Sequence, residues 1–501
     1  MNNLKKYIFV ASLFSSIFTA CGNDNIGGGG GDPAPVDPTS GDVLIYTTTG
    51  SLSHDFKKSY VDFSKTSNMG TKTIKIDESK KFQTMDGFGS AITGSAAFNL
   101  LKMAPEDRTK FLKETFSPTE GMGQSYIRIA IGCSDFSLDE YTLADEPGIE
   151  NFALQSEELE YVIPVLKEII AINPEIKIMG SPWTPPKWMK VNNLTELKPY
   201  DSWTGGHLNP KYYQDYAAYF VKYIQAMEKE GFKIDATTIQ NEPLNRGNSM
   251  SLYMTWQEQR DFVRDALGPA FEKAGIKTKI VVYDHNYNYD NDKSENYDQG
   301  QYPVKIYEDA NAAKYIDGAA YHAYGGEKEE LLTVHNAYPD KNLYFTEMSI
   351  GLWGEGYSFA KDLMWNMREV CIGSINNFNK AVIMWNYMLD DNHGPDRPGG
   401  CDICLGCITI DSNDYKTMDK NSHYYTMAHL SKVIKPGSFR IKSEGKTDEK
   451  IYYSAFENPD KSYSVVLLNE NQEQKTVTVA LGDKAFSYIV PAQSVISCIW
   501  K

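Results

Sequence analysis

The stretch TTIQNEPLN, residues 237–245, carries a run of β-forming residues into an amide, a carboxylate and a proline. A second stretch, NLYFTEMSIG at residues 342–351, has the same plan, with Glu347 standing where the first has Glu242. An acid that directly follows an apolar strand lies at the end of that strand. We therefore interpret both acids as strand-end residues, and the fold depends on how many similar strands surround them.

The chain around these stretches alternates short apolar strands with longer amphipathic helices. Residues 156–172 and 210–230 carry apolar side chains at helical spacing, and Thr255 with Glu258 has the spacing of a capping box. Eight segments have the composition of strands: 82–89, 125–132, 176–181, 235–240, 279–285, 317–324, 342–347 and 381–387. Eight strands, each followed by a helix, predict an α/β fold, a (β/α)8 TIM barrel over residues 84–435.

The segments on either side of the predicted barrel have a different residue pattern, with short β-forming runs and no helical spacing. Residues 436–501 contain short β-rich runs such as IYYSAF, SYSVVLL and KTVTVAL, separated by turn signals. Residues 42–83 also contain extended runs, DVLIYTTT and TKTIKID. We expect both segments to build one attached antiparallel β-sandwich, so that the barrel is inserted between its two parts.

The N-terminal residues predict export. Residues 1–20 place Lys5 and Lys6 before an apolar run that ends on small residues, which is typical of a secretory signal and too short for a membrane span. Cys21 follows directly, as in a bacterial lipoprotein cleavage site, and residues 21–41 are a Gly-, Pro- and Asp-rich tether. We expect an exported bacterial lipoprotein in the outer membrane, at the cell surface or in the periplasm, in contact with the membrane only through a lipid on Cys21. An ordinary cleaved signal is the alternative.

The composition of the chain bears on which classes of ligand it can bind. The formal net charge of −16 disfavours nucleic acid as a ligand, because the phosphate backbone would be repelled. The chain has 33 tyrosines, and aromatic rings of this kind stack well on sugar faces, although core packing also uses them.

The cysteine-rich segment CDICLGC contains Cys401, Cys404 and Cys407. A structural zinc needs four ligands, which a distant histidine such as His393 or His423 would have to complete. A local disulfide, Cys401 with Cys404, is the favoured interpretation in an exported protein, but spacing alone does not fix the pairing.

The two strand-end acids suggest a chemistry. In a (β/α)8 barrel the catalytic residues lie at the carboxyl ends of the strands, and two facing carboxylates are what glycoside hydrolysis requires. A metal-dependent hydrolase would recruit further histidines or acids, and nearby only His322 is available, so we expect no metal and no other cofactor. A purely structural pair of acids is the third interpretation.

Five further motifs resemble glycoside hydrolase family 30, a family of retaining enzymes with glucosylceramidases, β-1,6-glucanases and xylanases among its members. They run in the family's order over nearly the whole mature chain, from DGFGSAITGSAA (86–97) to VISCIW (495–500): RIAIGCSDFSLDEYTLAD (128–145), SPWTPPKWMK (181–190), NEP (241–243), YFTEMSIG (344–351) and HYYTMAHLSKVIKPGS (423–438). A single NEP motif would be weak evidence for the family, whereas five motifs in the family's order are specific evidence for it.

The resemblance implies catalytic roles. Glu242 matches the acid/base and Glu347 the nucleophile, while Asn241 matches a ligand of the sugar 2-hydroxyl. Arg128 matches a residue that supports the nucleophile, since a fixed positive charge keeps a carboxylate ionised. A buried ion pair without a catalytic part is the alternative for Arg128.

The resemblance also implies sugar contacts. Asp135 and Trp183 match residues that hold the sugar in the first subsite, and Trp385 matches a platform for it. His322 and Tyr324 match active-site positions, and the tyrosine hydroxyl would orient the nucleophile. A structural histidine is the alternative for His322.

The substrate expectation depends on the loop GGCDICLGCITID at residues 399–411. It is similar to the β-1,6-glucanase branch rather than the glucosylceramidase pattern, although Cys407 departs from both. The resemblance therefore implies an endo-β-1,6-glucanase that acts on β-glucan oligo- or polysaccharide. The alternatives are an exo-acting β-glucosidase or glucosylceramidase, then a xylanase or a glycan-binding protein without activity.

Overall fold

The computed structural model describes residues 39–66, 72–288 and 299–501. Two predicted segments lie outside these ranges. They are the signal at residues 1–20 and residues 21–38 of the tether, which include Cys21. Among the helices of the described ranges, none has the length and apolar composition needed to cross a membrane.

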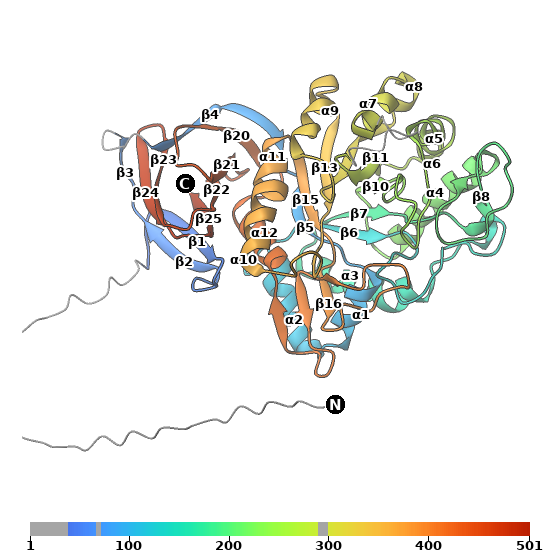
Figure 1. Ribbon diagram of the computed structural model, residues 1–501, viewed down its shortest axis with the longest axis horizontal. Helices are drawn as coiled ribbons and strands as arrows, with labels where there is room; N and C mark the ends of the chain where they lie inside the picture. Colours follow the sequence, from blue (N-terminus) through green and yellow to red (C-terminus); the bar gives the residue numbers. More distant parts are fainter. Residues whose placement is uncertain (1–38, 67–71, 289–298) are drawn as a thin grey trace, which may run out of the picture. The chain divides into compact units, whose positions relative to one another are not determined.

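Eight parallel strands form the barrel, and all eight overlap the predicted segments (Figure 1). A bridge between Ala91 and Arg128 joins the first strand to the second and closes the ring. The strands are β5 (Gly87–Ser90), β6 (Tyr126–Ala130), β7 (Lys177–Ser181), β10 (Ala236–Thr238), β11 (Lys279–Asn286), β12 (Ile316–His322), β13 (Asn342–Glu347) and β15 (Asn379–Met384). Inward-facing side chains such as Tyr126, Val281 and Tyr344 fill the interior, so the barrel is a packed core rather than a pore.

Helices cover the outside of the barrel. They are α1 (Gly94–Lys102), α2 (Pro105–Phe116), α3 (Ile163–Ile172), α4 (Tyr213–Lys229), α5 (Trp256–Phe262), α6 (Gly268–Ala274), α7 (Tyr302–Tyr307), α8 (Ala310–Ala313), α9 (Leu331–Ala337), α10 (Phe359–Trp365), α11 (Ser374–Asn376) and α12 (Ser422–Val433). The capping box predicted at Thr255 and Glu258 is present and starts α5.

The second domain is a ten-stranded sheet with the order β2-β1-β25-β22-β21-β20-β4-β23-β24-β3. Its strands are β1 (Val43–Thr49), β2 (Lys57–Val61), β3 (Ser64–Lys65), β4 (Thr73–Thr84), β20 (Phe439–Glu444), β21 (Ile451–Glu457), β22 (Tyr463–Asn469), β23 (Lys475–Leu481), β24 (Lys484–Val490) and β25 (Ser494–Trp500). Figure 1 shows the blue N-terminal strands among the red C-terminal ones. Both ends of the described part of the chain therefore build the sandwich, as expected, with the barrel between.

One predicted strand is wrong in its first half. Residues 82–84 of the segment 82–89 belong to the end of β4 and pair with β20 of the sandwich, whereas the barrel strand β5 begins at Gly87. The chain passes between the two domains without a change in β-forming composition, so the sequence carries no boundary signal there.

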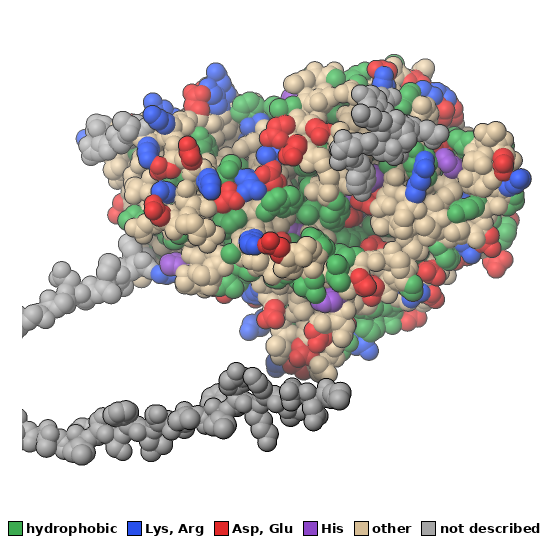
Figure 2. Space-filling model, viewed as in Figure 1, with side chains coloured by type: hydrophobic (Ala, Val, Ile, Leu, Met, Phe, Trp, Pro, Cys, Tyr) green, Lys and Arg blue, Asp and Glu red, His purple; other side chains and the backbone are tan. Residues whose placement is uncertain are grey.

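Helix α12 connects the two domains. His429 lies on this helix with Nδ1 2.8 Å from Oγ of Ser497 on β25 and Nε2 2.9 Å from Oγ1 of Thr48 on β1. All three side chains are buried. Figure 2 shows acidic and basic side chains intermixed over the visible face, so the excess negative charge forms no single patch there.

Short strands in the loops after β7, β13 and β15 complete the fold. They are β8 (Lys190–Val191), β9 (His207–Leu208), β14 (Ile350–Gly351), β16 (Met388–Asp390), β17 (Cys404–Leu405), β18 (Ile408–Ile410) and β19 (Met418–Lys420). Because these loops follow barrel strands, they gather at the carboxyl end of the barrel and shape whatever site lies there.

Candidate active site

The two strand-end acids meet at the carboxyl end of the barrel. Glu242 follows β10, Glu347 ends β13, and one carboxylate oxygen of each lies within 4.8 Å of the other. Both side chains are buried, although each lines the same pocket. Glu242 has a φ of +46°, an unusual conformation for a residue with a side chain, and its backbone N–H donates to the carbonyl of Asp284 at 2.9 Å. The backbone therefore fixes the direction in which this carboxylate points.

Arg128 organises the floor of the site. From β6 its guanidinium donates to Oε2 of Glu347 at 2.6 Å, to Oδ2 of Asp284 at 2.8 Å and to Oδ1 of Asn241 at 2.8 Å. Nε donates to Ser181 at 3.0 Å, so each of the three nitrogens of this fully buried side chain has a partner. Arg128 thus lies where the sequence placed it, against Glu347, and it also orients the Asn241 amide.

Asp284 is a central residue that sequence reasoning missed. It lies in β11, fully buried, and accepts hydrogen bonds from Thr238 at 2.7 Å and Thr346 at 2.6 Å in addition to Arg128. Burial alone would raise the pKa of Asp284, but Arg128 and His322 outweigh it and hold the carboxyl well below its usual range. Asp284 is therefore a permanent negative charge behind the two glutamates.

His322 bridges this charge to Glu242. Its Nε2 lies 3.1 Å from Oδ1 of Asp284 and its Nδ1 lies 3.1 Å from Oε1 of Glu242. Burial opposes protonation, but the surrounding carboxylates, Glu347 and Asp284 foremost, raise the pKa of His322 to about 9. With both ring nitrogens donating to carboxylates, His322 has no lone pair left for a metal, although its atoms and those of the two glutamates are close enough to hold one.

The two glutamates differ in their surroundings. Burial would raise the pKa of Glu242, but the positive charges of His285 and His322 and the amide of Asn245 lower it to about 2. His285 itself is neutral above about pH 4 because burial lowers its pKa, so His322 supplies the charge at neutral pH. Burial raises the pKa of Glu347, the negative charge of Glu242 adds to this, and His322 and Arg128 oppose it.

The cluster therefore carries a proton that is not on Glu242 in the free protein. Since the surroundings lower the pKa of Glu242 and raise that of His322, the proton lies on the imidazole. The 3.1 Å contact between Nδ1 of His322 and Oε1 of Glu242 is a hydrogen bond along which it can pass.

The predicted sugar contacts divide into two layers. Asp135, Tyr324 and Trp385 line the pocket, and Tyr324 donates its hydroxyl to Oε1 of Glu347 at 3.2 Å. Trp183 lies behind Trp385, with ring centroids 5.1 Å apart, and the Arg128 guanidinium lies 4.9 Å from its ring. Trp183, Asn241, His322 and Arg128 are thus arranged as supports of the residues that face the pocket.

Asp135 has an unsatisfied polar atom. Burial, with the negative charges of Glu347 and Glu242, raises the pKa of its carboxyl well above the usual range. Within the described residues, Oδ1 of Asp135 has no hydrogen-bond partner. A sugar hydroxyl in the pocket would supply one.

The pocket has a volume of about 430 Å³. It is lined by Asp135, Glu242, Asn245, Asn248, Tyr324, Glu347, Trp353, Trp385, Gly400, Cys401 and Cys404. Asn245 and Asn248 donate to Oε2 of Glu242 at 2.7 and 3.3 Å. Neither amide was singled out from the sequence, nor was Trp353, although each lies in a loop directly after one of the two acid-bearing strands.

The cysteine-rich segment forms a disulfide between Cys401 and Cys404, as favoured from the sequence. Cys407 is a buried free thiol 3.2 Å from Oγ of Ser90. The zinc interpretation of this segment is wrong, because two of its three thiols are bonded to each other and the third is packed into the protein. The bridge itself is part of the pocket wall.

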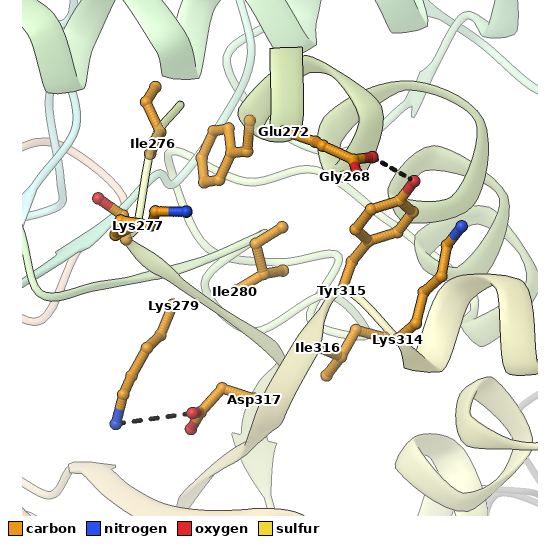
Figure 3. Close-up of a pocket in the computed structure, with 12 residues that line it drawn as sticks. Gly268, Glu272, Ile276, Lys277, Lys279, Ile280, Lys314, Tyr315, Ile316 and Asp317 are labelled. Atoms are coloured by element: carbon orange, nitrogen blue, oxygen red, sulfur yellow. Dashed lines mark hydrogen bonds and ion pairs between the residues drawn. The ribbon is translucent and has the colours of Figure 1, made fainter. Parts of the chain in front are cut away.

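A groove of about 560 Å³ lies at the opposite end of the barrel (Figure 3). Its two acids are already paired: Asp317 lies 3.6 Å from Lys279, and Glu272 accepts a hydrogen bond from Tyr315 at 3.3 Å. Both β11 and β12 begin here, and this end of a barrel serves stability rather than chemistry. We assign the groove no catalytic part despite its size.

Two buried carboxylates this close together, at the carboxyl ends of barrel strands, define the class of retaining glycoside hydrolases, since inverting enzymes hold theirs roughly 6.5–9.5 Å apart. Comparison with known proteins agrees. The chain belongs to glycosyl hydrolase family 30: residues 85–434 match the family's TIM-barrel domain and residues 437–498 its beta sandwich domain.

Individual relatives cover most of the chain. The solved structure of the endo-beta1,6-glucanase BT3312 is 58% identical, with a TM-score of 0.88 over 92% of this chain and 99% of that one. The endo-1,6-beta-D-glucanase of Neurospora crassa is 34% identical over 386 residues, 74% of this chain and 75% of the relative. The lysosomal acid glucosylceramidase of Mus musculus is 28% identical over 452 residues, 85% of this chain and 83% of the relative.

Proposed function

We propose that this protein is a retaining endo-β-1,6-glucanase. The observation that carries the substrate is the 58% identity to an endo-beta1,6-glucanase over 92% of the chain, well above the 28% identity to a glucosylceramidase. The observation that carries the mechanism is the approach of Glu242 and Glu347 to within 4.8 Å.

In the first step Glu347 attacks the anomeric carbon while Glu242 gives its proton to the glycosidic oxygen, so that the bond to the leaving sugar breaks and a glycosyl ester forms. The proton reaches Glu242 from Nδ1 of His322 as the sugar excludes water from the carboxylate. In the second step Glu242 takes a proton from water, which attacks the ester and releases Glu347, and the proton then returns from Glu242 to Nδ1 of His322.

Arg128 and Tyr324 act on the nucleophile in this scheme. Both contact the carboxylate of Glu347, one through a charged and one through a neutral donor, and they hold it in position for the attack. The unpaired oxygen of Asp135 binds a hydroxyl of the sugar, and Trp385 packs against its ring.

A panel of polymers tests the substrate. The purified protein without residues 1–20 is incubated with pustulan, laminarin, xylan and glucosylceramide, and the early products are resolved, with Glu347→Gln as the inactive control. Short oligosaccharides from pustulan alone are expected. Glucose alone would favour the exo-acting β-glucosidase or glucosylceramidase alternative, release from xylan would favour a xylanase, and binding without release would favour a glycan-binding protein.

We also propose that the mature chain is attached to a bacterial membrane by a lipid on Cys21, in keeping with the sequence FTAC at 18–21. Fractionation of cells that express the full chain tests this. The wild type is expected with the membranes and Cys21→Ser in the soluble fraction, and equal distribution of the two would refute the anchor.

A further inference from the structure

The loop after the proposed nucleophile is tied to the disulfide loop. Strand β14 pairs antiparallel with β17, with Ile350 opposite Leu405 and Gly351 opposite Cys404. Just beyond, the backbone N–H of Leu352 donates to the carbonyl of Ile403 at 2.9 Å. The Cys401–Cys404 bridge thus fixes a short ladder that begins three residues after Glu347.

Trp353 lies at the end of this ladder, on the edge of the catalytic pocket. Its indole folds back over Gly351, so closely that a Cβ atom on the glycine would come within 2.2 Å of Cζ3. The side chain lines the pocket together with both cysteines. Its position is therefore set by backbone pairing and by the missing side chain of Gly351, not by burial.

Trp353 is exposed, whereas the two tryptophans near the catalytic glutamates, Trp385 in the pocket wall and Trp183 behind it, are buried. It is 41% exposed, whereas Trp183 and Trp385 are 1% and 3% exposed. Leu352 and Ile403 beside it are 44% and 39% exposed, and Trp353 is absent from the hydrophobic cores of the described residues. Core packing does not account for this tryptophan.

An exposed indole that continues the wall of a sugar pocket fits the apolar face of a second sugar ring. We propose that Trp353, flanked by Leu352 and Ile403 and braced by the Cys401–Cys404 bridge, is a subsite for the glucose unit next to the one held between Glu242 and Glu347. The inference rests on the proposed function. Its occupant is the same glucan chain, because Trp353 and the two glutamates line one continuous cavity.

The subsite predicts a split between substrates. Trp353→Ala loses about tenfold in kcat/KM on pustulan, mainly through KM, because a stacking contact is removed from a group that does no chemistry. Trp353→Phe recovers most of the loss. β-Glucosyl fluoride offers only one sugar and a leaving group of a single atom, so Trp353→Ala loses far less on it than on pustulan.

Kinetics on both substrates with these variants test the inference. Ile489→Ala, which removes an exposed apolar side chain on β24 of the sandwich, is the matched control. Unchanged pustulan kinetics in Trp353→Ala would overturn the subsite, and so would an equal loss on both substrates, which would mean that Trp353 acts on the reacting glucose rather than on its neighbour. If the wild type cleaves β-glucosyl fluoride but releases nothing from pustulan, the proposed function fails and the subsite fails with it. If the wild type cleaves pustulan and only the Trp353→Ala result disagrees, the subsite fails while the proposed function stands.

Discussion

Nδ1 of His322 lies 3.1 Å from Oε1 of Glu242, while Nε2 of the same ring faces Asp284 at 3.1 Å. The imidazole is thus fixed at both ends by carboxylates. Because its pKa is raised to about 9, the ring holds a proton beside Glu242 throughout the neutral range. In the proposed mechanism, this proton is the one that Glu242 passes to the leaving oxygen.

This relationship predicts the alkaline limb of the pH profile. As pH rises through about 9, His322 loses its proton and kcat/KM on pustulan falls. In His322→Gln that limb moves to lower pH, since the stored proton is absent. An alkaline limb at the same pH in the variant would show that His322 does not supply the proton.

The separation of the glutamates predicts the product's configuration. With one oxygen of each glutamate within 4.8 Å of the other, the pair has the close spacing of retaining enzymes, so a β-linked glucan first yields the β-anomer. Proton NMR during the first turnovers measures this. An initial α-anomer would refute the retaining mechanism.

The two glutamates predict different responses to removal of their charge. Glu347→Gln removes the nucleophile and nearly abolishes cleavage of all substrates. Glu242→Gln loses about 10²–10⁴-fold on pustulan but keeps the first step on an aryl glucoside whose leaving group needs no proton. The rate of aryl release under single-turnover conditions measures the contrast, and equal losses in the two variants would reverse or refute the assignment.

Arg128 predicts a large stability effect. In Arg128→Leu, the buried carboxylates of Asp284 and Glu347 lose their partner, and we expect a cost of about 3–5 kcal/mol in the free energy of unfolding. Arg128→Lys keeps a charge but not the four contacts, so it folds better than the leucine variant and remains poorly active. Urea unfolding measures the difference. A loss below about 1 kcal/mol in Arg128→Leu would mean that the cluster is open to water.

The burial of His429 between the two domains predicts that the free energy of unfolding falls at acid pH. Burial lowers its pKa from 6.5 to about 3, so below pH 6.5 the unfolded chain binds a proton that the folded chain does not. The stability that neutral His429 contributes is therefore fully present above pH 6.5 and is lost as pH falls toward 3. His429→Gln, whose amide can still contact Ser497 and Thr48, should show a smaller fall in unfolding free energy between pH 7 and pH 4. Equal slopes in variant and wild type would contradict the assignment.

Much of the barrel could be predicted from the sequence because its eight strands are apolar runs with helices between them. Glu242 and Glu347 were accessible for the same reason, since each breaks such a run at its end. Asp284 was not, because β11 contains a register shift between Tyr283 and His285, and both Tyr283 and Asp284 have positive φ. That irregularity turns an acid in the middle of an apparently regular strand toward the site.

Trp353 was missed for another reason. Its place depends on the pairing of β14 with β17, two segments far apart in the sequence, and on the contact with Gly351. Spacing within its own loop says nothing about that partner. Local sequence patterns locate strand ends well. The walls of the pocket, by contrast, are formed by loops that come together only in the folded chain.

The pairing of β1 with β25 sets the order in which the protein can be completed. Val43 lies opposite Trp500 and Thr49 opposite Ser494. Strand β1 therefore cannot pair with β25 until residues 494–500 have been synthesised. The barrel strands, by contrast, are contiguous between residues 87 and 384 and can close while the C-terminus is still being synthesised. Until β25 arrives, one side of β1 is an open edge available to other chains. The C-terminal strand is therefore the last closure of the fold, and a chain truncated before Ser494 would retain the barrel strands beside a sandwich that lacks one strand and leaves β1 and β22 with open edges.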